Sequence, residues 1–246
     1  MSGRDGVRRL AIVTGASRGL GAVLAGFLAG EGYDLIVTAR GAAPLLERAE
    51  GWHRDFGVAV RPIAGDVRDP AHRAAIEAQA QRAGRVDLLV NNASELGPTP
   101  LPRLVDAPPE AFDAVLAVNL LAPLALVRGL RPWLARASGL VVNVSSDAAR
   151  GGYPGWGVYG ASKAALDLAS KTLAEELRAE RIAVVSVDPG DMRTEMARRA
   201  FGDVDLSDRP APEVTLPFWA WLLAQPFDRL SGQRFEAQTE RWEIPA

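Results

Sequence analysis

Cysteine is absent from the 246-residue sequence, and histidine occurs only twice, as His53 and His72. The absence of cysteine excludes disulfide bonds and thiol chemistry. Metal sites and histidine-based catalytic triads need several such groups at set spacings, and two scattered histidines do not supply them. We therefore expect no metal site and no cysteine or histidine nucleophile.

Long blocks of like charge and long apolar runs are also missing. The 28 basic and 30 acidic residues give a formal net charge of −2, and neither sign is gathered into a block. This distribution does not favour nucleic acid or an anionic membrane surface as a partner. Met1 to Arg9 is short and polar, and no run of about 18 apolar residues follows it. We expect a soluble, cytoplasmic protein with no nucleic-acid or membrane partner.

The length and the apolar content favour one folded unit. Hydrophobic residues make up 48% of the chain, which is enough for a sizeable core. No linker rich in proline, glycine and serine divides the sequence, and no repeat of fixed period is present. We therefore expect residues 1–246 to form a single α/β domain.

A glycine-rich turn stands near the beginning of the chain. Val7 to Val13 is a short apolar run, Thr14 to Gly21 carries the glycines, and an apolar helical pattern continues until Gly30 or Gly32. This order predicts a strand, a turn and a helix. Glycines also make ordinary turns, but between a strand and a helix they let the backbone approach a pyrophosphate. No Gly-Lys-Ser/Thr follows, so the turn is not a P-loop.

The residues after the second predicted strand indicate which dinucleotide would bind. Leu35 to Thr38 is followed by Ala39 and Arg40, where an NAD site would place an acidic residue for the ribose 2′-hydroxyl. Arginine suits a 2′-phosphate instead, and Arg18 in the glycine turn is a second candidate cation. The alternative is that both arginines are ordinary solvated side chains.

Polar residues follow two further predicted strands. Asp66-Val67 comes after Val58 to Ile63, where the carboxylate could accept from an adenine amine; Asp66 could equally cap the helix that starts near Pro70. Val86 to Val90 is followed by Asn91-Asn92-Ala93-Ser94, at the strand end where open α/β sheets bind ligands.

Tyr159 and Lys163 stand four residues apart at the head of an apolar helical segment. This spacing puts the phenol and the ammonium on one face of a helix. A neighbouring cation lowers the pKa of a phenol, so Tyr159 could serve as acid and base. Alone, the pair more often means a solvated lysine beside a half-buried tyrosine.

Together these motifs resemble the short-chain dehydrogenase/reductase family. Its order and spacing are matched, closely over about residues 7 to 195, by Thr14-Gly-x-x-x-Gly-x-Gly21, Asp66-Val67, Asn91-Asn92-Ala93, Asn119, Ser146, Tyr159-x-x-x-Lys163 and Pro189-Gly190. The resemblance implies a Rossmann-like doubly wound parallel sheet of about seven strands with helices on both faces.

The resemblance also implies the catalytic residues. The family places a serine thirteen positions before the tyrosine, which selects Ser146 over Ser145 as the group that holds the substrate carbonyl oxygen near the Tyr159 hydroxyl. Lys163 would lower the pKa of Tyr159 and bind the nicotinamide ribose. Asn119 resembles the residue that holds a water in the proton relay, although it could simply make a structural hydrogen bond in its helix.

The cofactor implied by the resemblance and by Arg40 is NADP(H). The residues expected to bind it are Gly15, Ser17, Arg18, Gly19, Leu20, Gly21, Arg40, Asp66, Val67, Asn92, Ala93, Tyr159, Lys163, Pro189, Gly190, Met192 and Thr194. The implied reaction is hydride transfer from the nicotinamide to a carbonyl carbon while Tyr159 delivers a proton to the oxygen.

Other functions are compatible with the same motifs. One alternative is an NAD-dependent alcohol dehydrogenase working oxidatively. The feature against it is that this sequence has no acidic residue at position 39 or 40. A dinucleotide-binding sensor or scaffold has no need of Ser146, Tyr159 and Lys163 together. Isomerases and dehydratases of the same superfamily generally carry a longer substrate domain.

The substrate is a small carbonyl compound or alcohol that the sequence does not identify. Residues that neighbour the motifs are candidates for its pocket: Glu95, Asp147, Tyr153, Trp156, Met192 and Met196. Residues 191–217 have the composition of a mobile substrate loop. The family commonly forms homodimers or homotetramers. The sequence departs from it at Ser94, which replaces a glycine, and after Ser231-Gly232-Gln233, where the usual Asp-Gly-Gly ending is missing.

Overall fold

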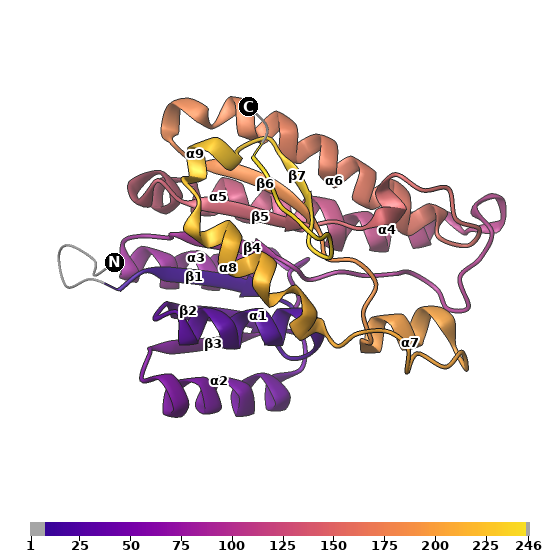
Figure 1. Ribbon diagram of the computed structural model, residues 1–246, viewed down its shortest axis with the longest axis horizontal. Coiled ribbons are helices and arrows are strands. Elements are labelled where there is room, and N and C mark those ends of the chain that lie inside the picture. Colours follow the sequence, from indigo (N-terminus) through magenta and orange to yellow (C-terminus); the bar gives the residue numbers. More distant parts are fainter. Residues whose placement is uncertain (1–7, 245–246) are drawn as a thin grey trace.

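The computed structural model describes residues 8–244, and its seven strands form one parallel sheet in the order β3-β2-β1-β4-β5-β6-β7 (Figure 1). The strands are β1 (Leu10–Thr14), β2 (Asp34–Ala39), β3 (Val60–Ala64), β4 (Leu88–Asn91), β5 (Leu140–Val144), β6 (Ala183–Asp188) and β7 (Arg234–Glu236). The main helices are α1 (Gly19–Gly30), α2 (Ala42–Phe56), α3 (Pro70–Ala83), α4 (Pro109–Leu116), α5 (Ala122–Ala137), α6 (Gly157–Glu176), α7 (Glu195–Phe201), α8 (Leu216–Ala224) and α9 (Phe227–Leu230). The expected Rossmann-like, single-domain α/β fold is confirmed.

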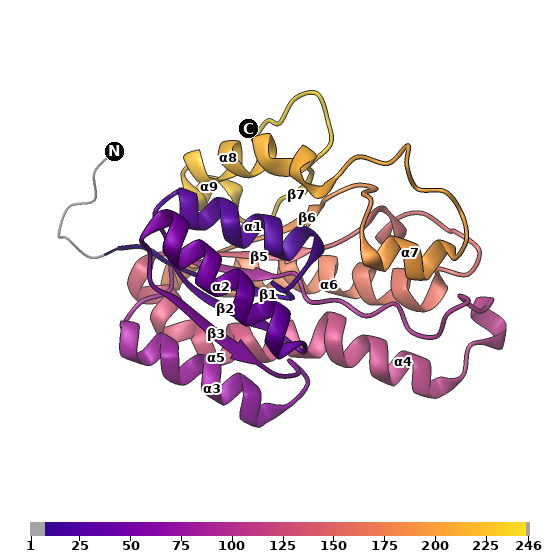
Figure 2. The same ribbon diagram turned by 90° about the horizontal axis from the view of Figure 1, so that it is seen from below.

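Helices cover both faces of this sheet because successive strand residues point to opposite sides. In β1, Ala11 and Val13 join a core cluster with residues of α1, α2, α8 and α9. Ile12, between them, joins a second cluster with residues of α3, α5 and α6. Figure 2 shows α1 and α8 on one side of the sheet and α3 and α5 on the other. Strands buried on both faces explain why the sequence shows continuous apolar runs there.

The chain reverses its direction of travel across the sheet at β1. It runs outward through β2 to β3 and then crosses back to β4, so β1 lies between β2 and β4. The carboxyl ends of β1 and β4 therefore meet at a topological switch point, where open α/β sheets form a crevice that holds ligands. The glycine turn follows β1, and the Asn91–Ser94 segment begins at the end of β4.

The strands keep their predicted places with small changes at their ends. The predicted first strand began at Val7, which lies outside the described residues. The third strand starts at Val60 rather than Val58, because the Ala59 amide donates to the Asp34 carboxylate at 2.8 Å before the ladder begins. The fourth starts at Leu88 rather than Val86, whose amide donates to the Trp133 carbonyl at 3.1 Å.

The segment 191–217 is more ordered than its composition predicted. It contains the helix α7, whose first turn is capped by the Thr194 hydroxyl, which accepts from the Ala197 amide at 3.1 Å. A short 3-10 turn, Pro212–Thr215, follows before α8. In Figure 1, α7 lies away from the body of the sheet, beyond the carboxyl ends of the strands. The segment is therefore partly helical, and its mobility stays a prediction.

One helical segment is longer and more apolar than the sequence reading allowed. A continuous helical segment of 29 residues is formed by α4, the π-helical turn Ala117–Leu121 and α5. Its most apolar window has a mean hydropathy of 1.7, so by length and composition alone the segment could cross a membrane. Leu126, Leu130 and Leu134 of α5 instead pack in the core against the sheet. These apolar residues of α5 are therefore explained by packing in the core of the α/β fold.

The last strand starts at Arg234, directly after Ser231-Gly232-Gln233. Phe235 is buried and joins an aromatic cluster with Phe218 and Trp221 of α8 and with Trp242 near the C-terminus. Ring centroids in this cluster are about 5.5 to 6.0 Å apart. The segment that departs from the expected family ending is thus packed by aromatic contacts.

Candidate active site

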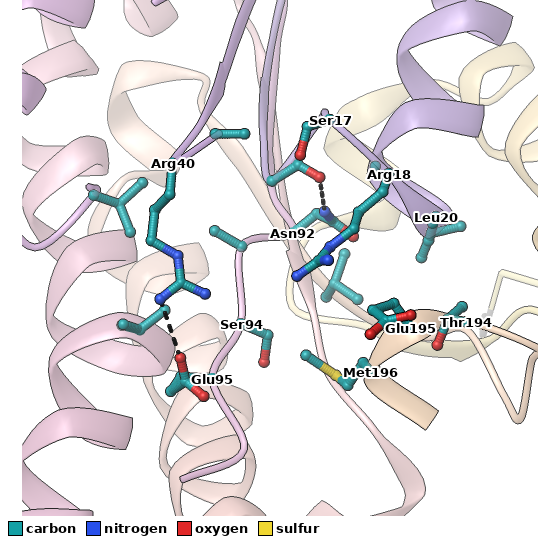
Figure 3. A pocket seen from close by; sticks show the side chains of 18 of the residues that line it. Ser17, Arg18, Leu20, Arg40, Asn92, Ser94, Glu95, Thr194, Glu195 and Met196 are labelled. Carbon is teal, nitrogen blue, oxygen red and sulfur yellow. Dashed lines mark hydrogen bonds and ion pairs between the residues drawn. The ribbon is translucent and has the colours of Figure 1, made fainter. Parts of the chain in front are cut away.

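A cavity of about 540 Å³ opens at the carboxyl ends of β1, β2, β4 and β5, at the switch point (Figure 3). This volume is in the range of small-molecule and cofactor sites. Most of the residues predicted to bind the cofactor line it: Gly15, Ser17, Arg18, Gly19, Leu20, Gly21, Arg40, Asp66, Val67, Asn92, Ala93, Tyr159, Lys163, Pro189, Met192 and Thr194. The fold therefore gathers residues from far along the chain into one cleft.

The glycine turn is held against β4 by Asn92. Its side-chain amide donates to the backbone carbonyls of Thr14, at 2.8 Å, and Gly15, at 3.3 Å. A Cβ on Gly15 would lie 2.8 Å from Asn92 Nδ2, and Gly15 has φ of +70°. Glycine is thus required here by packing inside the protein as well as by close approach of a ligand.

The amino end of α1 has the form of a pyrophosphate cradle. Its first residue follows Arg18, and no side chain among the described residues caps this end. Gly19 has φ of +56°, and a Cβ there would meet only the Thr194 side chain, at 3.8 Å. Uncapped helix amides and the helix dipole favour a phosphate, so these residues fit the diphosphate of a dinucleotide.

Two arginines that line the cavity share one carboxylate, and Figure 3 shows the pair that Arg40 makes with Glu95. Arg40, at the end of β2, places its guanidinium 3.4 Å from Glu95 Oε2. Arg199 of α7 reaches the other oxygen of the same carboxylate, at 3.3 Å. Glu95 is therefore shared between the two cations, a link that sequence reasoning missed because Arg199 comes from a helix it did not predict.

Asp66 does not cap α3. The Asp69 carboxylate does so, accepting from the Ala71 amide at 2.8 Å. Asp66 instead accepts from the Arg68 guanidinium, at 2.7 Å at its closest, and this hydrogen bond holds the pKa of Asp66 below its usual value. The carboxylate stays ionised beside the cavity, which leaves it as an acceptor for a ligand amine.

Tyr159 is buried at the inner end of the cavity with 7% of its surface exposed. Burial raises its pKa to about 12, while hydrogen bonds with the Ser94 and Ser146 hydroxyls act in the opposite direction. The expected lowering of the Tyr159 pKa by Lys163 is not found in this structure. Desolvation of the phenolate outweighs the favourable groups around it.

Lys163 lies beside Tyr159 but is directed mainly at the backbone. Its Nζ is 5.5 Å from the tyrosine ring centroid and donates to the Val144 carbonyl at 2.7 Å. Burial lowers the pKa of Lys163 to about 8, and the charge of Asp167 acts in the opposite direction. At neutral pH the lysine is still mostly charged and the tyrosine is protonated.

The two neighbouring serines have different surroundings. Ser146 donates to the Asp147 carboxylate at 2.9 Å and accepts from the Ala148 amide at 3.2 Å, and its hydroxyl lowers the pKa of Tyr159. Ser145 lines the cavity, but its buried hydroxyl has no partner among the described residues. Ser146 thus acts on the phenol, and its catalytic role stays a prediction.

Asn119 lies in the π-helical turn between α4 and α5. Its oxygen accepts from the Glu95 amide at 2.8 Å and the Ser94 hydroxyl at 3.2 Å, and its nitrogen donates to the Glu95 carbonyl and to Ser162, both at 2.9 Å. Both amide protons are used within the protein, so the side chain has no donor left for a water. These contacts fit a structural role for Asn119, whose hydrogen bonds join residues 94–95 to Ser162 of α6.

Two of the remaining predicted residues lie outside the cavity lining. Gly190 and Ser146 do not line the cavity; the backbone around Gly190 is held by Gln238, whose amide donates to the Pro189 and Asp191 carbonyls, both at 2.9 Å. Trp156 packs edge-on against the Tyr159 ring at 5.6 Å. Sequence reasoning missed several lining residues that carry no motif, among them Gly41, Pro44, Gly65, Glu195 and Arg199.

Comparison with known proteins agrees with this geometry. The family model described as short chain dehydrogenase matches residues 9–205. An L-xylo-3-hexulose reductase from Hypocrea jecorina is 37% identical over 206 residues, which cover 74% of this chain and 66% of that protein.

Solved structures extend the match over nearly the whole chain. A short-chain dehydrogenase from Shigella flexneri, described as complexed with NADP, superposes with a TM-score of 0.86 at 28% identity, over 96% of this chain and 100% of that one. One from Escherichia coli, described as complexed with NADPH, has a TM-score of 0.85 at 29% identity, with coverage of 96% and 100%. With the family model matched along most of its length, this chain belongs to the short-chain dehydrogenase family of oxidoreductases, whose members bind nicotinamide dinucleotides.

Proposed function

We propose that this protein reduces the carbonyl group of a small molecule to an alcohol with NADPH, using Tyr159 as the proton donor. One observation carries the proposal: the buried Tyr159 lines the same cavity as Lys163, and the Ser94 and Ser146 hydroxyls act on its phenol by lowering the pKa that burial raises. The glycine turn, Arg18 and Arg40 also line that cavity.

Arg18 and Arg40 support NADPH over NADH. Both line the cavity, and β2 ends in Ala39, with no carboxylate there for a ribose 2′-hydroxyl. A guanidinium binds a phosphate through two parallel hydrogen bonds. The NADP and NADPH named for the Shigella and Escherichia coli neighbours agree with this preference.

The nicotinamide, when bound, supplies the hydride, and the protein supplies position and a proton. Tyr159 stays protonated at neutral pH because burial holds its pKa at about 12, so the proton that the carbonyl oxygen needs is present on the phenol. Ser146 presents a hydroxyl to the same oxygen and stabilises the charge that develops there. The Lys163 ammonium then faces the phenolate that remains.

Alcohol oxidation would place a different demand on Tyr159. Oxidation needs Tyr159 as a phenolate base, and a phenol with a pKa of about 12 is almost fully protonated at pH 7. NAD-dependent alcohol oxidation is the second candidate function, because the family includes dehydrogenases working in that direction. A dinucleotide-binding sensor without turnover is the third.

We further propose that residues 191–217 act as a mobile cover for the substrate. Met196 and Arg199 of α7 line the cavity, and the Arg199–Glu95 ion pair, at 3.3 Å, joins the segment to the other side of the cleft. A homodimer or homotetramer is also proposed. Leu121 and Leu168, on neighbouring helical segments, are 58% and 68% exposed and would be covered in such an assembly.

The test is NADPH and NADH oxidation with a panel of aldehydes, α-diketones, β-ketoesters and quinones. Wild type is compared with Tyr159→Phe, which keeps the ring and removes the acid, and with Tyr33→Phe, which alters a buried tyrosine packed under Arg9. We expect Tyr159→Phe to lower kcat about 100-fold or more and Tyr33→Phe to leave it unchanged.

Other outcomes would favour the other candidates. Faster turnover with NAD and an alcohol than with NADPH and a carbonyl would support the oxidative enzyme. Tight NADPH binding without turnover of any carbonyl would support the sensor. Unchanged kcat in Tyr159→Phe would contradict the role given to its hydroxyl.

A further inference from the structure

A buried arginine on the last strand lies behind the catalytic residues. The Arg234 side chain is 4% exposed and stands where the sequence departs from its family's usual ending. Its neighbour Phe235 faces the aromatic cluster on one side of the sheet, so Arg234 faces the other side, towards α6. A charge buried at the end of a short edge strand needs an explanation beyond strand anchoring, since apolar packing would anchor it without desolvating a guanidinium.

Arg234 is bonded to the segment that carries Ser146. Its Nη2 donates to the backbone carbonyl of Ser146 at 3.0 Å and to the Asp188 carboxylate at 3.1 Å. Asp188 ends β6 and also accepts from the Gly190 amide at 3.0 Å. The guanidinium thus joins the turn after β5, which presents the Ser146 hydroxyl, to the turn after β6, which lines the cavity with Pro189 and Met192.

Arg234 is also bonded to the helix that carries Tyr159 and Lys163. Its Nε donates to Asp167 Oδ2 at 3.0 Å, and Asp167 follows Lys163 by one helical turn. The other Asp167 oxygen is buried and has no hydrogen-bond partner among the described residues. The orientation of this carboxylate beside Lys163 therefore depends on Arg234.

We infer that Arg234 is a positioning residue for the proposed reaction: from β7 it holds the backbone of Ser146 and fixes the Asp167 carboxylate next to Lys163, and it balances the charge of Asp188 behind Tyr159. This inference rests on the proposed function for its catalytic meaning. The contacts themselves join the backbone of Ser146, and the helix that carries Tyr159 and Lys163, to one guanidinium.

The charges that face this group come from several elements. Asp167 raises the pKa of Lys163, and the charges of Asp188 and Asp147 raise that of Tyr159. Glu236 accepts from Arg234 at 3.1 Å and lies 3.7 Å from Arg150. The charged or titratable groups around Arg234 are therefore Asp147, Arg150, Tyr159, Lys163, Asp167, Asp188 and Glu236. Removal of the guanidinium leaves two buried carboxylates without their cation.

The test uses the titration of Lys163, which needs no substrate. The chain has two lysines, Lys163 and Lys171. Protein labelled with 13C at lysine Cε gives two signals, and Lys171→Arg assigns them. In Arg234→Met we expect the pKa of Lys163 to rise by about 0.5 to 1 unit from its value near 8, because the uncompensated Asp167 favours the ammonium.

Arg234→Lys serves as the conservative variant and Arg85→Met as the matched control. The added lysine signal in Arg234→Lys is identified by comparison with wild type, and its cation should keep the Lys163 titration near the wild-type value. Arg85 donates to the Asp87 carboxylate at 2.9 Å beside the amino end of the central strand β4, at the opposite end of that strand from the cavity. Its loss should lower thermal stability without moving the Lys163 titration.

An unchanged Lys163 titration in Arg234→Met, with a fall in Tm like that of Arg85→Met, would show that Arg234 only anchors β7 and would overturn the inference. If Arg234→Met does not fold, Asp167→Asn is measured instead. There the pKa of Lys163 should fall, and an unchanged value overturns the inference.

If the protein reduces one of the carbonyl compounds, kcat for that compound gives a second readout. Arg234→Met should lower kcat about 10-fold, with a smaller effect in Arg234→Lys, because Ser146 loses its backbone support. If no carbonyl is turned over, the proposed function fails, while the Lys163 titration still decides whether Arg234 acts on the site.

Discussion

The guanidinium of Arg40 lies 3.4 Å from the Glu95 carboxylate, so the cation expected to meet a 2′-phosphate already has an acidic partner within the protein. The Arg40 side chain is 57% exposed, and exposed pairs of this kind contribute little to stability. A phosphate with two negative charges can therefore displace or share the arginine at small cost. Cofactor preference then depends on the balance between Arg40 and Glu95.

Replacement of Arg40 by Asp should weaken NADPH binding about 10- to 100-fold and leave NADH binding within a few-fold of wild type. The phosphate would lose a charge-assisted contact and gain a repulsive one, whereas a 2′-hydroxyl would gain an acceptor. Cofactor fluorescence titration measures both dissociation constants. Arg54→Asp, on the outer helix α2, controls for the change of net charge. Equal losses for both cofactors would contradict the preference for NADPH.

Glu95→Gln should strengthen NADPH binding by up to about 5-fold. The substitution keeps the size of the side chain and removes the charge that competes for Arg40, whose exposure limits the gain to roughly 1 kcal/mol. NADH binding should not change, which makes it the internal control in the same titration. Weaker NADPH binding in this variant would mean that Glu95 holds Arg40 in the orientation that the phosphate needs.

The rate of carbonyl reduction should fall above about pH 8. Lys163 has a pKa lowered to about 8, so it is charged below that pH and neutral above it, while Tyr159 keeps its proton until about pH 12. The phenolate left after proton transfer loses its neighbouring cation once Lys163 is neutral. A profile of kcat between pH 6 and 10 tests this. A rate that stays constant to pH 10 would contradict the role of the ammonium.

Lys163→Met should make the protein more stable at pH 7 and inactive. The folded-state pKa of about 8 lies below the ordinary value of 10.5, so between these pH values the unfolded chain binds more protons and stability rises with pH. At pH 7 the buried ammonium lowers the free energy of unfolding by its full amount. Its removal should therefore stabilise the fold by on the order of 2 kcal/mol, after subtraction of the hydrogen bond to the Val144 carbonyl that is lost with it.

The stability of Lys163→Met is measured by thermal unfolding. An increase in Tm of roughly 4 to 8 °C is expected for a domain of this size. Lys171→Met, at an exposed position of the same helix, should leave Tm unchanged. A lower Tm in Lys163→Met than in wild type would mean that the Val144 contact outweighs the cost of the buried charge.

Gly15→Ala should abolish dinucleotide binding and destabilise the fold. The new Cβ would lie 2.8 Å from Asn92 Nδ2 and would sit on a residue with φ of +70°. Gly32→Ala is the matched control, because Gly32 has φ of +79° and an added Cβ there meets nothing within 4 Å. Both variants should lose about 1 kcal/mol from backbone strain, and only Gly15→Ala should also lose cofactor affinity. Equal cofactor affinity in the two variants would contradict the role of the turn.

Local features of the chain could be predicted from the sequence because their causes are local. The turn between β1 and α1 follows from glycines placed between an apolar run and a helical pattern, and the common helix face of Tyr159 and Lys163 follows from their spacing. The spacing of Ser146 from Tyr159 likewise selected it over Ser145, and its hydroxyl lowers the pKa of Tyr159 in the structure. Strand ends shifted where a single hydrogen bond, such as that of Ala59 to Asp34, decided them.

Only the tertiary structure decided the electrostatics of the site and the contacts between distant segments. The pKa of Tyr159 depends on how deeply the fold buries it, and spacing carries no information on burial. The four hydrogen bonds of Asn119 and the position of Arg234 behind Ser146 join residues that are 24 to 88 positions apart. Such contacts form only when the sheet brings the ends of its strands together, so the sequence determined the reactive groups and the fold determined their charges and partners.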